Sequence, residues 1–132
     1  MMKEIYVVGA IIKSQSKVLC AQRSDKMSLP GLWEFPGGKI EGEETHQEAL
    51  KREINEELKM DIRASDQLFK KVTYDYDFGR VHLSAYRCEL IKGTPILTEH
   101  QTVKWLEIDD LDKLSWAPAD IPIVDKLKKE GS

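Results

Sequence analysis

The sequence predicts an α+β fold in a single domain, and three observations support this prediction. Several stretches show the two-residue alternation or the continuous apolar run of β-strands, and others show the 3.6-residue periodicity of helices. Turns rich in glycine, proline and serine separate these stretches. The 132 residues contain no internal repeat, low-complexity tract or interdomain linker. We therefore expect residues 1–132 to form one α+β domain.

Composition and charge narrow the class of protein. Hydrophobic residues make up 41% of the chain and charged residues 33%, as in soluble globular proteins. The net charge of −3 offers no basic surface for DNA or RNA, so we expect no direct nucleic-acid binding. No apolar run approaches the roughly 20 residues of a membrane span. The N-terminal residues do not resemble a signal peptide, so we expect a cytoplasmic protein without membrane contact.

The two cysteines, Cys20 and Cys88, lie far apart in the sequence. They lack the Cys-x-x-Cys or Cys/His spacing that is typical of a metal site. In a reducing cytosol we expect both to be buried free thiols, with a disulfide or a metal site as the alternative.

The N-terminal part of the chain is predicted to form two strands and a loop. Residues 5–12 are apolar at almost every position, which is typical of a central strand covered on both faces. A turn at 14–16 leads to a second strand at 17–22, and Arg23 stands at its end. Residues 24–32 form a polar loop punctuated by glycine and proline. From its position alone, Arg23 would be a surface residue.

The strongest pattern in the chain predicts a helix at 44–59. Leu50, Ile54 and Leu58 recur every four residues and form an apolar stripe. Beside the stripe, three carboxylates fall within about 100° of the helix surface: Glu53, Glu56 and Glu57. Like charges at this spacing repel one another, and the apolar stripe adds a desolvation cost. A bound Mg²⁺ or Mn²⁺ would remove both penalties; the alternative is a solvated acidic face.

The C-terminal half is predicted to contain three strands, a short helical connector and a helix. Residues 72–78 alternate apolar and polar side chains, and 80–90 form the antiparallel partner strand. A further strand follows at 103–108, then a short helical connector at 109–114 and an amphipathic helix. We interpret one aromatic face as core, although it could stack on a base; it consists of Tyr74, Tyr76 and Phe78.

The segment around this predicted helix resembles the Nudix box, the loop–helix signature of hydrolases that split a nucleoside diphosphate linked to another group. Gly38 is followed after five residues by Glu44, and after seven more by Arg52-Glu53-Ile54-Asn55-Glu56-Glu57. Every charged position of the box is filled. Lys59 departs from the family, which has glycine just after the helix. Lysine can adopt the left-handed C-cap conformation there, at a cost of about 1 kcal/mol.

The resemblance implies the Nudix fold, a mixed sheet between helices, and a divalent metal site. Mg²⁺, with Mn²⁺ as a substitute, would be bound by the Gly38 carbonyl and by four carboxylates: Glu53, Glu56, Glu57 and Glu99. One of these carboxylates would accept the proton of the attacking water. Arg52 would orient a glutamate of the box, and Glu44, on the far side of the helix from Glu53, would hold the loop. His100, next to Glu99, could be a ligand or a base; we favour no role for it, because oxygen ligands suffice for Mg²⁺.

Two further segments resemble the MutT-like and CTP pyrophosphohydrolase-like branches of the family. They are residues 32–41, which lead into the box, and residues 117–122, Ala-Pro-Ala-Asp-Ile-Pro. In the MutT-like branch an arginine at the end of the second strand contacts phosphates, and the side chain at the position of Asp120 reads the base. The resemblance therefore implies four substrate-binding residues: Arg23, Phe35, Lys39 and Asp120. Asp120 could instead only cap a helix.

The predicted function is a Mg²⁺-dependent nucleoside triphosphate pyrophosphohydrolase that releases a nucleoside monophosphate and pyrophosphate. The resemblance implies a preference for oxidised or modified nucleotides, of the 8-oxo-dGTP type or the CTP type. The alternatives are a hydrolase of ADP-ribose or a dinucleotide, and a non-catalytic nucleotide-binding module. The expected partner is a small-molecule nucleotide, bound by a monomer or a weak homodimer.

Overall fold

A computed structural model describes residues 2–130 of the chain. The strands are β1 (Glu4–Ser14), β2 (Lys17–Gln22), β3 (Trp33–Glu34), β4 (Gly37–Lys39), β5 (Asp61–Tyr76), β6 (Gly79–Lys92) and β7 (Thr102–Glu107). The α-helices are α1 (His46–Leu58) and α2 (Ile121–Glu130), and two short 3-10 helices are η1 (Ile108–Lys113) and η2 (Pro118–Asp120).

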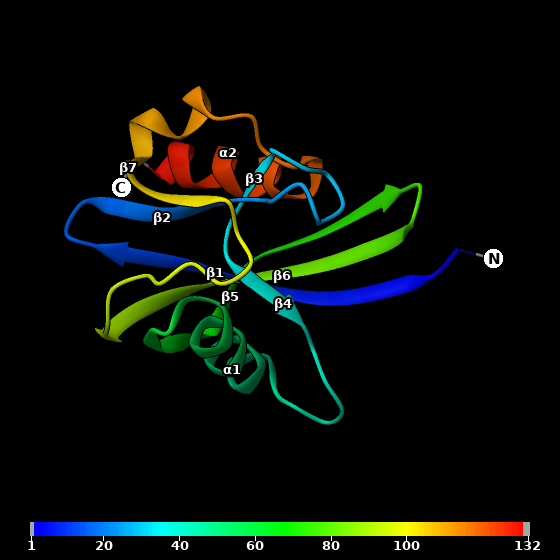
Figure 1. The fold of residues 1–132 in the computed structure, drawn as a ribbon, viewed down its shortest axis with the longest axis horizontal. Coiled ribbons are helices and arrows are strands. Elements are labelled where there is room, and N and C mark those ends of the chain that lie inside the picture. Colours follow the sequence, from blue (N-terminus) through cyan, green and yellow to red (C-terminus); the bar gives the residue numbers. More distant parts are fainter. Residues whose placement is uncertain (1, 131–132) are drawn as a thin grey trace.

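The strands form one mixed sheet that lies between two helical layers. Its central path runs β3-β2-β1-β6-β5, with β4 paired to β1 and β7 paired to β2. Strands β1 and β6 run parallel, and the remaining pairs are antiparallel. Helix α1 covers one face of the sheet, and α2 covers the other (Figure 1). The predicted α+β fold with a mixed sheet between helices is confirmed.

The apolar run of β1 is explained by burial of both faces of the sheet. Alternate side chains of a strand point to opposite faces, so each face receives its own set. The core beneath α1 includes Val8, Ala10 and Ile12 from β1 and Leu50, Ile54 and Leu58 from the helix. The core beneath α2 includes Ile11 from β1 and Ile123, Val124 and Leu127 from the helix. Residues 5–12 therefore lie in a central strand, as predicted.

The two cysteines are buried free thiols, as predicted. Cys20 belongs to the core beneath α2, and Cys88 belongs to the core beneath α1, so the sheet separates them. Burial raises the pKa of each thiol to about 12. A thiol that keeps its proton is a poor nucleophile and a poor metal ligand, so both cysteines act as small core residues.

Helix α1 begins at His46 and not at residue 44, because Thr45 caps it. The Thr45 hydroxyl accepts a hydrogen bond from the Glu48 N–H at 3.1 Å, and the Glu48 carboxylate accepts one from the Thr45 N–H at 2.8 Å. This reciprocal pair is a capping box, and its Thr-x-x-Glu spacing is present in the sequence. The predicted start was therefore wrong by about half a turn.

The helix ends at Leu58, and Lys59 adopts the left-handed conformation with φ 58° and ψ 36°. The Lys59 N–H donates to the Asn55 carbonyl at 3.0 Å, which closes the last turn. This conformation costs a residue with a Cβ more than it costs glycine. Lys59 therefore forms the left-handed C-cap that glycine usually forms.

The structure corrects the prediction for the strand after the helix. Strand β5 begins at Asp61, whereas the sequence indicated 72–78. Its pairing with β6 shifts register between Ala64 and Leu68 and again between Leu68 and Lys70. These irregularities interrupt the two-residue alternation, so the first half of the strand carries no clean pattern. Strands β3 and β4 were also missed, because they are too short for periodicity to show.

The structure only partly confirms the aromatic residues at the end of β5 as core: Tyr76 packs against the core beneath α2, whereas Tyr74 and Phe78 do not belong to it. Tyr74 is 40% exposed and Phe78 is 44% exposed. The Tyr76 ring stacks on Phe78 at a centroid distance of 5.0 Å, and its hydroxyl accepts a hydrogen bond from the Ala119 N–H. The rings stand on an edge strand with only part of their surface covered. Separately, no helix within residues 2–130 has the length and apolar character needed to cross a bilayer.

Replacing Lys59 with glycine should stabilise the protein by up to about 1 kcal/mol, because glycine adopts positive φ without strain. Chemical denaturation monitored by circular dichroism measures this difference. Lys51→Gly is the matched control: Lys51 is an exposed lysine inside α1, where glycine should destabilise by about 1 kcal/mol. A Lys59→Gly protein that is less stable than wild type would show that positive φ imposes no strain at this position.

Candidate active site

A cleft of about 370 Å³ opens beside the glycines of β4. Residues from distant parts of the chain line it, among them Arg23, Phe35, Gly38, Lys39, Glu57 and Asp120. Each of these was predicted from the sequence to bind substrate or metal. The fold therefore gathers the predicted substrate-binding residues around one cavity, together with one box glutamate and the glycine loop.

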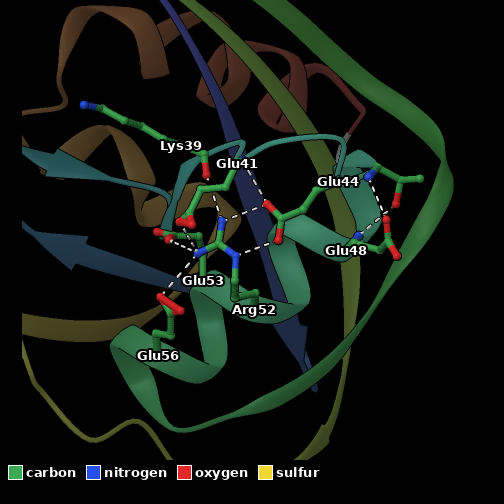
Figure 2. Close-up of polar contacts among 8 residues, drawn as sticks. Lys39, Glu41, Glu44, Glu48, Arg52, Glu53 and Glu56 are labelled. Atoms are coloured by element: carbon green, nitrogen blue, oxygen red, sulfur yellow. Dashed lines mark hydrogen bonds and ion pairs between the residues drawn. The ribbon is translucent and has the colours of Figure 1, made fainter.

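Arg52 stands among the remaining glutamates of the box and of the loop before it (Figure 2). Its guanidinium donates to both carboxylate oxygens of Glu44, at 2.6 and 2.9 Å, and to the Lys39 carbonyl at 3.0 Å. It also donates to Glu53 at 2.6 Å and to Glu56 at 3.3 Å. The hydrogen bond from Arg52 lowers the pKa of Glu44 to about 2. One guanidinium thus ties the acidic loop to the helix.

This cluster corrects two interpretations from the sequence. Glu44 does not lie on the far side of the helix from Glu53, because both carboxylates contact the same guanidinium. The sequence also suggested that a cation relieves the repulsion among the box glutamates. In the structure the positive charge of Arg52 relieves part of this repulsion, because Arg52 binds Glu53 and Glu56. Arg52 itself keeps its proton firmly, since the bonds to Glu44 and Glu53 raise its pKa.

Both glycines of β4 lie in close approaches: Gly37 lies against the backbone of β1, and Gly38 lies against the side chain of Glu53. Strand β4 pairs with β1 so that Gly38 lies opposite Val8. A Cβ at Gly37 would lie 1.9 Å from the Val8 carbonyl oxygen, and a Cβ at Gly38 would lie 1.6 Å from Glu53 Oε2. No larger residue fits at either position without movement of its neighbours. The backbone of Gly38 is therefore held against the Glu53 carboxylate.

Glu57 lies on the cleft side of α1, in a buried and acidic environment. Its side chain is only 11% exposed, and its Oε2 is buried without a hydrogen-bond partner among residues 2–130. Burial, followed by the nearby charges of Glu53, Glu34 and Glu99, raises the pKa of Glu57 to about 9. In the absence of a cation the carboxyl therefore holds its proton at neutral pH.

These residues fit a divalent cation, although they are not preassembled around one. Within residues 2–130, no group of three or more His, Cys, Asp or Glu side chains converges in a form that could hold an ion. Arg52 takes up oxygens of Glu53 and Glu56 instead. The unpartnered Oε2 of Glu57, together with the Glu53 carboxylate against Gly38, offers the oxygen donors that Mg²⁺ prefers. A bound cation would favour the ionised form of Glu57, which burial and the neighbouring carboxylates disfavour in its absence.

Arg23 projects into the cleft from the end of β2, in an orientation fixed by three contacts. Its Nη1 donates to Glu34 at 2.6 Å, and its Nε and Nη2 donate to the carbonyl and hydroxyl of Ser28 at 2.5 and 2.9 Å. Nothing in the sequence pattern indicated Glu34, which lies in the short strand β3. The predicted phosphate-binding arginine is thus already paired with a carboxylate in the cleft.

Asp120 also lines the cleft and is almost fully buried. Its Oδ1 accepts a hydrogen bond from the Phe35 N–H at 3.0 Å, although the two residues are 85 positions apart. Desolvation, reinforced by the charge of Glu34, raises the pKa of Asp120 well above its usual range. The Phe35 ring stacks on Trp116 at 4.8 Å. Asp120 therefore fixes the segment that leads into the box, a role beyond that of a helix cap.

The remaining predicted residues take different positions. Glu99 is exposed and lines a neighbouring hollow, which shares Met27 with the cleft. The side chain of Lys39 extends away from the glutamate cluster (Figure 2). His100, to which the sequence gave no role, is buried, and its Nε2 lies 2.7 Å from Glu34 Oε2. In the sequence, the one indication of a role for His100 was its position next to Glu99.

Comparison with known proteins identifies the family. A model of the NUDIX domain matches residues 7–126 of the chain. The CTP pyrophosphohydrolase of Escherichia coli K12 is 38% identical over 128 residues, which cover 94% of this chain and 91% of that protein. The 8-oxo-dGTP diphosphatase of the same organism is 30% identical over 97% of this chain and 99% of its own length.

A solved structure gives the same result. The solution NMR structure described as DNA mismatch repair protein MutT, family Nudix hydrolase, from methicillin-resistant Staphylococcus aureus 252 is 57% identical to this chain. The match has a TM-score of 0.79 and covers 99% of this chain and all of that one. The chain belongs to the Nudix family, and its fold is the Nudix fold. It is a Nudix hydrolase, and enzymes of this family act on small nucleotides and generally use a divalent metal.

The pKa of Glu57 predicts how the stability of the metal-free protein depends on pH. Between the ordinary value of 4.5 and the raised value of about 9, the folded state binds a proton that the unfolded state has lost. Stability should therefore fall as pH rises through this window. Glu57→Gln should remove this loss, so at about pH 9 it should exceed wild type by at least ~1.4 kcal/mol, the equivalent of one pKa unit.

Denaturation in EDTA at several pH values tests this prediction. At about pH 4 wild type and Glu57→Gln should be equally stable, because both side chains are neutral there. Glu43→Gln, at an exposed position before the helix, controls for the loss of one charge. A difference between wild type and Glu57→Gln that does not grow with pH would contradict the buried, protonated state of Glu57.

Proposed function

We propose that this protein is a Mg²⁺-dependent nucleoside triphosphate pyrophosphohydrolase, which converts a nucleoside triphosphate to the monophosphate and pyrophosphate. The observation that carries the proposal is the position of Glu57 and Gly38 on the wall of the same cleft as Arg23 and Asp120. Oxygen donors for a cation, a guanidinium for phosphate and the aromatic side chains of Phe35 and Tyr76 thus line one cavity. The resemblance to a CTP pyrophosphohydrolase and to an 8-oxo-dGTP diphosphatase supports the same reaction.

At the phosphate end, each residue has a distinct task. Glu53 and Glu57, with the Gly38 carbonyl, would hold the cation, and Glu56 and Glu99 are further candidate ligands. The cation, when bound, neutralises charge on the triphosphate and acidifies a water molecule. Arg52 orients Glu53 and anchors the loop that carries Gly38. Arg23 offers a planar guanidinium, which is suited to phosphate oxygens.

At the base end, a carboxyl group and an aromatic wall would recognise the nucleobase. Phe35 and Tyr76 line the cleft, and Asp120 lies beside them. Since Asp120 Oδ1 already accepts the Phe35 N–H, its second oxygen is the one that can serve a base. In the protonated state favoured by burial, that group donates a hydrogen bond, while a carboxylate oxygen of Glu34 nearby can accept one. Cytosine and oxidised guanine both offer a donor beside an acceptor, so both suit this end of the cleft.

The activity is tested by incubating the protein and Mg²⁺ with dCTP, 5-methyl-dCTP, dGTP, 8-oxo-dGTP, ADP-ribose and a dinucleoside polyphosphate. The proposal expects monophosphate and pyrophosphate from at least one triphosphate. Glu57→Gln should lower kcat by at least ~100-fold, which is the effect of losing a principal electrostatic group. Preferential hydrolysis of ADP-ribose or of the dinucleotide would instead support the alternative hydrolase, and the absence of any turnover would support a binding module.

Arg23→Ala should weaken nucleotide binding by about 1.5–3 kcal/mol, the contribution of a charge-assisted hydrogen bond. The loss should be similar for every base, because all triphosphates share the phosphate contact. Competition with a non-hydrolysable analogue of each nucleotide measures it. Arg23→Lys, which keeps the charge but loses the planar fork, should recover only part of the affinity. A loss confined to one nucleobase would show that Arg23 acts on the base.

Asp120→Asn should change kcat/KM for the favoured nucleotide by at least ~10-fold, about 1.4 kcal/mol. Asparagine keeps an oxygen for the Phe35 N–H but presents only a donor to the base, whereas a carboxyl can also accept. Nucleotides that do not contact this group should change little. Parallel kinetics on dCTP, 5-methyl-dCTP, dGTP and 8-oxo-dGTP provide the comparison. An equal fall for all four would reduce Asp120 to a structural support for Phe35.

A further inference from the structure

His100 lies between two carboxylates that line the cleft, those of Glu34 and Glu57. Its Nε2 is 2.7 Å from Glu34 Oε2, and its Nδ1 faces Glu57 Oε2 at 3.9 Å. The imidazole side chain is only 1% exposed. Glu34 in turn binds Arg23 at 2.6 Å. A continuous row of side chains therefore runs from the arginine of the cleft, through the histidine, to the glutamate of α1.

The loop that carries His100 is fixed to its surroundings, so the position of the ring is set by the fold. The Thr98 hydroxyl donates to the Glu57 carbonyl at 2.6 Å, and the Ile96 N–H donates to the Leu58 carbonyl at 2.9 Å. On the other side of the ring, the Gln101 N–H donates to the Gln22 carbonyl at 2.9 Å. The loop is thus anchored both to the end of α1 and to the end of β2.

Two polar atoms in this row have no partner. Among the buried side-chain nitrogen and oxygen atoms of residues 2–130, Glu57 Oε2 and His100 Nδ1 lack a hydrogen bond. Buried polar atoms without partners are rare and costly. These two face one another, and a movement of about 1 Å would bring them within hydrogen-bond range. After such a movement, whichever of the two atoms carries the proton would donate it to the other in one hydrogen bond.

We propose that His100 is a positioning residue: Glu34 holds its ring, and the ring fixes the Glu57 carboxylate in the orientation that binds the metal. This inference rests on the proposed function only in taking Glu57 as a metal ligand. Groups that hydrogen-bond to a metal-binding carboxylate, and so fix its orientation, contribute strongly to metal affinity. The second carboxylate of the row, Glu34, also binds Arg23, the proposed phosphate contact, so the same histidine joins a nucleotide-binding residue to the metal site.

The test is the affinity for Mn²⁺ without nucleotide, measured by electron paramagnetic resonance of free Mn²⁺ during titration. His100→Leu removes both ring nitrogens and should raise the Kd by about 10-fold or more. His100→Asn keeps an amide near the position of Nδ1 and should remain within about threefold of wild type. His82→Leu is the matched control, because its Nε2 lies 2.6 Å from Glu4 outside the cleft. Its Kd should not change.

A second pair of variants leaves His100 in place and covers the case in which its variants fail to fold. Glu34→Gln removes the charge but keeps an oxygen that can accept from the ring, whereas Glu34→Leu removes the acceptor. The Kd for Mn²⁺ should be at least about threefold higher in Glu34→Leu than in Glu34→Gln. Equal values for these two variants would overturn the proposal. So would a folded His100→Leu protein with wild-type affinity, an Asn variant as weak as the Leu variant, or a wild type that binds no Mn²⁺.

The same measurements separate this inference from the proposed function. A protein that binds Mn²⁺ through His100 but hydrolyses no nucleoside triphosphate would defeat the function and leave the positioning role intact. With nucleotide present, His100→Leu should lower kcat more than it raises KM at a fixed, low Mn²⁺ concentration, and added Mn²⁺ should restore kcat. A purely structural role would lower thermal stability without this rescue by metal.

Discussion

The arrangement of the site depends on one guanidinium, that of Arg52. Box glutamates packed beside an apolar stripe would repel one another, and the loop before the helix adds further acids. Arg52 donates to Glu44, Glu53 and Glu56, and it also holds the Lys39 carbonyl. Its planar fork of five donors can serve several acceptors at fixed angles, which a lysine cannot do. The glycine loop is consequently held against the helix, and the Gly38 backbone is pressed against Glu53. The same contacts leave Glu57 free to face the cleft.

The sequence predicts those parts of the fold that leave a local pattern of apolar and polar residues. The apolar run of β1 and the four-residue recurrence in α1 predict buried elements, and both elements are present, although α1 begins about half a turn later than predicted. Lys59 takes the left-handed conformation that the family's glycine suggested. Periodicity alone gives an α+β class, and the Nudix fold follows only because Gly38, Glu44 and the Arg-Glu-x-x-Glu-Glu run match a known motif. The first half of β5 was missed because its pairing slips out of register, which erases the alternation.

The parts of the site that sequence could not give are those made by contacts between distant residues. Glu34 binds Arg23 on one side and His100 on the other, and it lies in a two-residue strand with no pattern of its own. Asp120 accepts from the Phe35 N–H across 85 residues. The contact between Glu44 and Arg52 reverses an inference from helical geometry, because Glu44 lies before the helix and not on it. Burial decides the charge state of Glu57 and Asp120, and burial is a property of the folded chain.

The central claim is that the oxygens of Glu53, Glu57 and Gly38 bind a divalent cation at the wall of the nucleotide cleft. A crystal structure with Mn²⁺ and a non-hydrolysable nucleoside triphosphate tests it most directly, because the anomalous signal of manganese locates the ion. The account predicts an anomalous peak within about 2.3 Å of these oxygens and of the phosphates, with the base between Phe35 and Asp120. A manganese peak bound elsewhere, with no contact between the ion and Glu57, would contradict it.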